Sequence, residues 1–264
     1  MVRGLLCALL VAGCDEVWSI DHVDYAGDDD AQANVSCAQD PHDEDCDGFP
    51  DGSDRCPGVA DDQTDADGDG LGDACDPSGT TNERVELFIS FADPAQTWNV
   101  LAGDWHPHAD SYVYSSVAFA NSGVARFTGI VPEPPFWIEV HFRVDAIDVQ
   151  VSQFLVVVDA DPAGDGVACG HDRQVNPLVD RVRATYAHAT TGNEIDIMTV
   201  APGEYRVLAT YDRTSKIHCT LRADDNSTSG TTMASASPPQ PGALAVRSFR
   251  IGATVHWIAV YKTY

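Results

Sequence analysis

The chain has 264 residues, and its 41 Asp and Glu against 15 Lys and Arg give a formal net charge of −26. A protein that binds nucleic acid needs a basic surface to displace counterions from phosphates, so this composition excludes that class of protein. The charge is also uneven, because residues 15–78 contain 21 acidic residues and a single basic one, Arg55. Two physically different regions therefore follow one another along the chain.

The chain begins with a basic residue, Arg3, and a short apolar run that ends in Val11-Ala12-Gly13-Cys14. The run is too short to span a bilayer as a permanent helix and is typical of a secretion signal. Its end resembles the bacterial lipobox, in which a peptidase cuts before a lipid-bearing cysteine. The resemblance implies a signal peptide over residues 1–13, a membrane anchor at Cys14, and an extracytoplasmic lipoprotein in the periplasm or on the cell surface. The alternative is an ordinary cleaved signal followed by an incidental cysteine.

Six cysteines remain once the signal and Cys14 are set aside. An even number in an exported chain predicts three disulfides, although six cysteines allow 15 pairings. Zinc binding is the competing use, but no C-x-x-C spacing occurs among them, which disfavours zinc. The cysteines concerned are Cys37, Cys46, Cys56, Cys75, Cys169 and Cys219.

Residues 14–36 are acidic and without periodicity, which predicts a flexible tether. After it, the template D-x-D-x-D-G-x-x-D-x-x-D occurs twice, 22 residues apart. Calcium takes six to eight oxygen ligands, and carboxylates at positions 1, 3 and 5 can meet on one ion if a glycine at position 6 turns the chain. The carbonyl at position 7 and carboxylates at positions 9 and 12 would complete each shell. The predicted Ca²⁺ ligands are Asp43, Asp45, Asp47, Phe49, Asp51 and Asp54, then Asp65, Asp67, Asp69, Leu71, Asp73 and Asp76.

Two other interpretations of this segment are a solvated acidic linker and a pair of EF-hands. A linker would place its acids at arbitrary positions, and EF-hands need flanking helices, for which Pro57-Gly58 leaves no room. The segment instead resembles the thrombospondin type 3 repeat over about residues 37–77, through Cys56-Pro57 and the closing Gly72-Asp73-Ala74-Cys75-Asp76. The resemblance implies a calcium-wrapped ribbon without an apolar core, with Cys56 bonded to Cys75 and Cys37 bonded to Cys46. The first copy departs from the family pattern, because Cys46 lies inside its loop and Pro50 stands at position 8.

From Glu83 onward, apolar and polar residues alternate. Phe136, Ile138, Val140, Phe142 and Val144 alternate with Trp137, Glu139, His141, Arg143 and Asp145, which predicts a half-buried strand. Ten similar runs and the absence of sustained helical periodicity predict an all-β fold, a two-sheet sandwich or jelly roll over residues 83–264. The predicted strands are 85–91, 111–119, 124–130, 136–145, 151–159, 179–187, 195–200, 204–211, 216–222, 244–250 and 254–262, with a long surface loop at 227–242.

This second region resembles concanavalin A-like and laminin G-like domains. The resemblance is carried by Thr97-Trp98, Gly103-Asp104-Trp105, Ile217-His218-Cys219, and an ending of Pro241-Gly242 and two apolar strands. It implies a jelly roll that binds a sugar or a protein, with Cys169 and Cys219 bridged between neighbouring strands. Trp137 shares the polar face of its strand with His141 and Arg143, and these three residues form the candidate ligand face.

An enzymatic alternative rests on Glu194-Ile195-Asp196, which resembles the catalytic strand of laminarinase-type glycosidases. Retaining hydrolysis needs a nucleophile and an acid/base carboxyl group about 5–5.5 Å apart. The acid/base position is occupied here by Met198 or Thr199, so the sequence predicts that the protein is not an enzyme.

The sequence thus predicts a lipid-anchored, calcium-binding envelope protein whose head binds a glycan or a cell-surface or matrix protein. A purely structural surface protein without a head ligand is the main alternative. The head has its own alternating strands and little of the net charge. We therefore expect chelation of calcium to expand residues 37–77 and to leave the head's melting temperature nearly unchanged.

Overall fold

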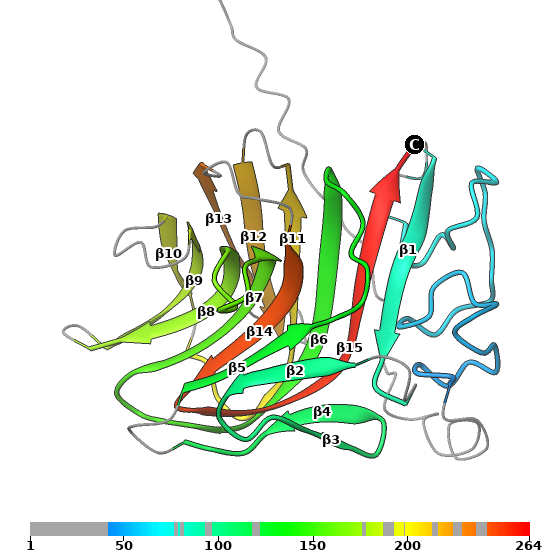
Figure 1. Cartoon of the computed structure of the whole chain (residues 1–264). Coiled ribbons are helices and arrows are strands. Elements are labelled where there is room, and N and C mark those ends of the chain that lie inside the picture. The colour runs from blue at the N-terminus through cyan, green and yellow to red at the C-terminus, as the bar shows by residue number, and fades with distance from the viewer. Residues whose placement is uncertain are drawn as a thin grey trace, which may run out of the picture.

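The computed structural model describes residues 42–264 except 77–78, 80–81, 93–96, 118–121, 176–177, 187–192, 198, 213–215, 224–228 and 236–241. The predicted signal peptide, Cys14, the tether and Cys37 lie outside the described residues. Two antiparallel sheets form a β-sandwich, and residues 42–76, here called the ribbon, lie beside one edge of it (Figure 1). The predicted all-β, two-sheet fold is confirmed. Among the described residues, no helix has the length and apolar character needed to cross a membrane.

Within the described residues, one sheet has eight strands and the other has seven, and every pairing is antiparallel. The larger sheet has the order β13 (Ser229–Ser235), β12 (Lys216–Ala223), β11 (Gly203–Tyr211), β6 (Phe136–Ile147), β15 (Ile251–Thr263), β4 (Ser111–Tyr114) and β3 (His106–His108), and β1 (Glu83–Ser90) also pairs with β15. The smaller sheet has the order β10 (Asn193–Ile197), β9 (Val179–Tyr186), β8 (Val167–Gln174), β7 (Ser152–Ala160), β14 (Ala243–Phe249), β5 (Ser122–Phe127) and β2 (Trp98–Ala102).

The core lies between the two sheets and follows the predicted alternation. On β6, Phe136 and the alternate residues up to Val144 are buried in it, while the residues between them point to the other face of the sheet. Phe142 of the larger sheet stacks on Phe154 of the smaller one, with ring centroids 3.9 Å apart. Each such side chain contributes about 1.5–3 kcal/mol through its removal from water. Apolar burial between the sheets is therefore the main source of the head's stability.

Four strands were not predicted, and each lacks a clear apolar alternation. The predicted loop 227–242 is wrong over Ser229–Ser235, because this stretch forms β13 and pairs with β12. Strand β8 escapes prediction because its second half, Gly170-His171-Asp172-Arg173, is charged and yet buried. Strands β2 and β3 are short edge strands.

The pairing of Cys169 with Cys219 is confirmed, with Cα atoms 5.4 Å apart. The two strands that it joins, β8 and β12, belong to different sheets, so they are neighbours across the sandwich rather than within one sheet. A cross-link between residues 50 positions apart restricts the unfolded chain and contributes about 4 kcal/mol in the chain-entropy account. The disulfide therefore clamps the two layers together.

The ribbon packs on the outer face of the larger sheet, so the prediction of two independent parts is wrong. Val59 and Leu71 are buried against Trp257 and Tyr261 of β15, together with the disulfide of the ribbon. Strand β15 is apolar on both faces over Trp257–Tyr261, and a β-bulge just before this stretch sets which residues face the ribbon. Val255 pairs with Phe142 and Trp257 with His141, which leaves His256 as an extra residue. The apolar residues of the ribbon are thus buried against side chains of the sheet. This contact was not predictable from the few apolar residues of the ribbon alone.

A buried ionic network closes one end of the smaller sheet. Asp180 on β9 accepts hydrogen bonds from Nε2 of His171 at 2.7 Å, Nε of Arg173 at 2.7 Å and the backbone N–H of Val200 at 2.8 Å. Burial on its own raises the pKa of Asp180, but the hydrogen bonds from His171 and Arg173 outweigh it and lower the pKa to about 2. The ionised carboxylate is therefore favoured in the folded chain.

We predict that Asp180→Asn destabilises the protein at pH 7 by about 3–5 kcal/mol, because it leaves Arg173 buried without a counter-charge. The pKa of Asp180 falls from 3.8 to about 2 on folding, so its contribution is complete above pH 3.8 and is lost as the pH falls towards 2. Thermal unfolding of wild type and variant at several pH values tests this. The exposed Asp196→Asn is the control and should cost less than about 1 kcal/mol. A wild-type-to-variant gap that stays constant from pH 7 to pH 2 would contradict the prediction.

Candidate metal-binding site

The ribbon has no helix or strand over residues 42–76 and is held by turns and a disulfide. The predicted pairing of Cys56 with Cys75 is confirmed, with Cα atoms 5.6 Å apart. Cys46 is disulfide-bonded as well, and its predicted partner, Cys37, lies outside the described residues. Covalent links therefore replace regular secondary structure in this segment.

The two copies of the acidic template fold in the same way. Gly48 donates its backbone N–H to Oδ2 of Asp43 at 3.0 Å, and Gly70 donates to Oδ2 of Asp65 at 3.1 Å. The φ angles of these glycines are +97° and +104°, in the left-handed region that glycine adopts without steric cost. The sharp turn expected at template position 6 is therefore present in both copies.

The first three carboxylates of each copy converge, as predicted. Asp43, Asp45 and Asp47 each offer one oxygen, and these oxygens lie within 4.8 Å of one another. In the second copy, Asp65, Asp67 and Asp69 form the equivalent group.

Two further groups of carboxylates begin at template position 5. Asp47 meets Asp54 and Asp61, and the second copy repeats this arrangement with Asp69, Asp76 and Glu83. Asp61 and Glu83 were not predicted from the sequence; they lie at position 19 of an extended template. The sequence did contain a sign of their role, because the two residues are 22 positions apart, the same interval that separates the two copies of the template. Glu83 is the first residue of β1, so this last group joins the ribbon to the sandwich.

The other predicted ligands lie outside these four groups. Asp51 accepts the backbone N–H of Glu44 at 3.2 Å, and Asp73 accepts that of Ala66 at 2.8 Å, so both close the loops. Phe49 is exposed and Leu71 is buried. Metal ligation through the two carbonyls stays a prediction.

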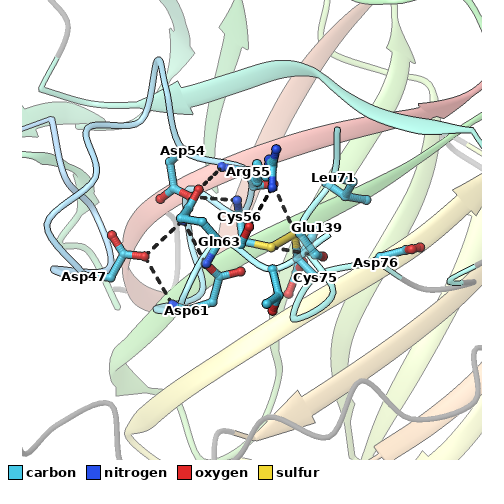
Figure 2. Close-up of a disulfide and its surroundings, with 12 residues drawn as sticks. Asp47, Asp54, Arg55, Cys56, Asp61, Gln63, Leu71, Cys75, Asp76 and Glu139 are labelled. Atoms are coloured by element: carbon cyan, nitrogen blue, oxygen red, sulfur yellow. Dashed lines mark hydrogen bonds between the residues drawn. A yellow bond between two sulfur atoms is a disulfide. The ribbon is translucent and has the colours of Figure 1, made fainter. Parts of the chain in front are cut away.

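A glutamine amide marks the centre of the group around Asp54. Nε2 of Gln63 donates to Asp54 at 2.6 Å, to Asp61 at 2.8 Å and to Asp47 at 3.3 Å, and Figure 2 shows the three carboxylates around it. An amide nitrogen carries two hydrogens and no net charge, so it cannot neutralise three carboxylates. The group therefore keeps an excess of negative charge, and its three carboxylates could hold a metal ion.

The crowding of carboxylates has a large electrostatic cost. Burial, followed by repulsion from Asp54 and Asp47, raises the pKa of Asp45 to about 8. Burial and repulsion from Asp51 raise the pKa of Glu44 to about 8 in the same way. Ionisation of these two residues is therefore disfavoured near neutral pH, and a nearby positive charge would favour it.

The candidate ligand face on β6 is arranged along the strand as predicted, but each of its residues also has a protein partner. Trp137 stacks on Tyr261, with ring centroids 5.2 Å apart, next to the ribbon. Nε2 of His141 lies 3.3 Å from Oε2 of Glu204. Nε of Arg143 donates to Oδ1 of Asp145 at 2.7 Å.

Glu204 also contacts a second histidine, because Nε2 of His256 lies 3.2 Å from the same carboxylate oxygen. Burial alone raises the pKa of Glu204, but the contacts with His141 and His256 lower it well below its ordinary value. His256, the extra residue of the β15 bulge, therefore helps to keep Glu204 ionised on the face that carries His141.

The motif of the glycosidase alternative lies on edge strand β10. Arg181 contacts Oε2 of Glu194 at 2.6 Å and Oδ1 of Asp196 at 2.9 Å. Met198 lies outside the described residues. Both carboxylates are thus held by one guanidinium group, which favours a structural role for them.

No protein-family model matches this chain, and no curated protein matches it. Solved structures similar to it include the winged bean acidic lectin complexed with methyl-alpha-D-galactose, with 10% identity over 67% of this chain and 99% of that chain and a TM-score of 0.49. The carbohydrate-binding module CBM66 from Bacillus subtilis has 12% identity, coverage of 60% and 91%, and a TM-score of 0.46. The VIP36 exoplasmic/lumenal domain in its Ca²⁺/Man3GlcNAc-bound form has 9% identity, coverage of 65% and 86%, and a TM-score of 0.47. These are likenesses of fold.

We predict that Asp61→Asn weakens cation binding by the first copy by roughly tenfold, because the charge of the coordinating oxygens sets the affinity. The matched control is Asp62→Asn, since the exposed Asp62 carboxylate accepts bonds from Thr64 and belongs to no carboxylate group among the described residues. Calcium titration of the two variants is the measurement. Equal affinities would show that Asp61 is not a ligand.

Proposed function

We propose that the protein is an extracytoplasmic calcium-binding protein whose ribbon holds the ions and whose sandwich acts as a recognition head. The observation that carries this proposal is the repetition of two adjoining carboxylate groups at an interval of 22 residues. Acidic side chains gathered by chance would not repeat their partners and their turns in register. The resemblance to the thrombospondin type 3 repeat points to the same ion.

The chemistry of the groups favours calcium over other metals. Every group consists of carboxylate oxygens, the ligands that hard cations prefer. Magnesium demands a compact octahedral shell and holds its waters, whereas calcium accepts the irregular, ligand-rich shell that a flexible ribbon supplies. The described ribbon cysteines are in disulfides, so they are not available as thiolate ligands for zinc.

The disulfides support an oxidising, extracytoplasmic location. Attachment to a membrane through an acylated Cys14, after removal of residues 1–13, is the proposed anchor. Mass spectrometry of the native N-terminus tests it, since an unmodified Cys14 or cleavage at another position would remove the anchor from the proposal.

The proposed ligand of the head is a glycan or a cell-surface or matrix protein. His141 and Arg143 support this role, because their side chains remain 19% and 46% exposed on the outer face of β6. A structural surface protein without a head ligand is the competing proposal, and the paired carboxylates on β10 make a glycosidase less favoured.

Calorimetric titration of the full exported chain with calcium tests the ion sites. We expect at least two bound ions, with dissociation constants of about 10⁻⁴–10⁻³ M, because exposed extracellular modules bind in this range. Asp69→Ala should impair the second copy most, since Asp69 belongs to both of its groups. The absence of any calcium-dependent heat at millimolar calcium would reject the proposal.

For the head, a glycan array probed with the full exported chain in calcium separates recognition from a structural role. We expect Arg143→Ala to lower the affinity for a bound glycan by about tenfold or more, as the loss of one important contact does. The control is Arg84→Ala, because Arg84 is exposed on β1, a strand that carries none of the three candidate residues. An array without any bound glycan would leave a protein ligand or the structural alternative.

A further inference from the structure

The outer face of the larger sheet carries an aromatic strip, defined here as Phe88 of β1, Trp137 of β6, and Trp257 and Tyr261 of β15. The rings form one surface, with Phe88 and Trp257 centroids 5.9 Å apart and Trp137 and Tyr261 stacked at 5.2 Å. Trp257 and Tyr261 are each 2% exposed. The strip faces away from the core between the sheets, so another part of the chain must cover it.

The cover is the central part of the ribbon. Val59 and Leu71 are buried on the strip, and the disulfide between Cys56 and Cys75 lies in the same contact. The fit is close at Gly58, where an added Cβ would lie 2.5 Å from the ring of Trp257. Figure 2 shows Leu71 and the disulfide together with Glu139, a buried residue of β6.

Carboxylates of the ribbon meet both ends of β1, on either side of this apolar contact. At the end of the strand, Ser90 makes side-chain hydrogen bonds with Glu44 and Asp51. At its start, the backbone N–H of Glu83 donates to Oδ2 of Asp69 at 2.5 Å, within the last carboxylate group. Figure 1 shows the ribbon running along β1. It makes an acidic contact at each end of the strand and an apolar contact between them.

We propose that the ribbon is a calcium-set strap: with calcium bound it closes over the aromatic strip, and on calcium removal it lifts and exposes the strip. This inference rests on the proposed calcium binding. Without the ions, like charges repel at separations well inside the Debye length of about 8–10 Å, and the few apolar residues of the ribbon do not offset that repulsion and the entropy of ordering the segment. Because such coupling is reciprocal, packing of the ribbon on the aromatic strip also increases the affinity for calcium.

The first test compares the full exported chain in calcium and in chelator. Acrylamide quenching of tryptophan fluorescence should rise in chelator, because two of the five tryptophans lie in the strip. The melting temperature of the sandwich should fall by several degrees. If calorimetry detects calcium binding but quenching and melting are unchanged, the strap is wrong and calcium binding stands. If no calcium binds, the proposed function fails, and the strap with it.

The second test lifts the strap without changing a carboxylate. Gly58→Ala places a methyl group against Trp257, and it should raise quenching in calcium and weaken calcium binding by about tenfold, within the usual range of coupling between sites. Gly52→Ala is the matched control, because its Cβ would meet nothing within 4 Å. Identical quenching and affinity in the two variants would overturn the strap. Should Gly58→Ala fail to fold, the comparison in chelator still decides.

Discussion

The burial of β15 on both faces is the interaction on which the rest of the molecule depends. One face of the strand completes the core between the sheets, and the other supports the ribbon. Its edges pair with β6 on one side, and with β4 and then β1 on the other. The extra residue at His256 reverses which residues face inward halfway along the strand, so Ile258 and Val260 face the core while Trp257 and Tyr261 face the ribbon. A regular strand would have turned Trp257 into the core and placed Ile258 and Val260 against the ribbon instead.

The ribbon combines two features that oppose one another. Its carboxylates need to be close together to bind a cation, and their closeness opposes folding until the cation arrives. A segment of this kind cannot accumulate a core of its own, since each apolar residue displaces a potential ligand. The structure resolves this by separating the tasks in space: the carboxylates gather in the loops, whereas Val59, Leu71 and the disulfide lie on the sheet. Apolar support comes from residues nearly 200 positions further along the chain.

The features that depended on local pattern were predicted from the sequence. Alternation located β6 and β15, and the spacing of Asp43, Asp45 and Asp47 gave the convergence of the first carboxylate group. Features that depended on tertiary partners were not predictable in this way. The charged half of β8 is buried because Asp180, on the next strand, pairs with it. Glu83 reads as the first polar residue of a strand, and only its proximity to Asp69 and Asp76 gives it a place among the carboxylates.

The two ends of the sandwich meet. Glu83 pairs with Thr263, and the backbone N–H of Tyr264 donates to the carbonyl of Asn82 at 2.8 Å. The first strand of the sandwich therefore begins next to the point where the last strand ends, at Asn82 and Tyr264. Joining these ends with a short peptide and opening another surface loop would keep every strand pairing, so the head has the geometry of a circularly permutable domain. The same proximity means that any polypeptide fused after Tyr264 emerges beside the first strand.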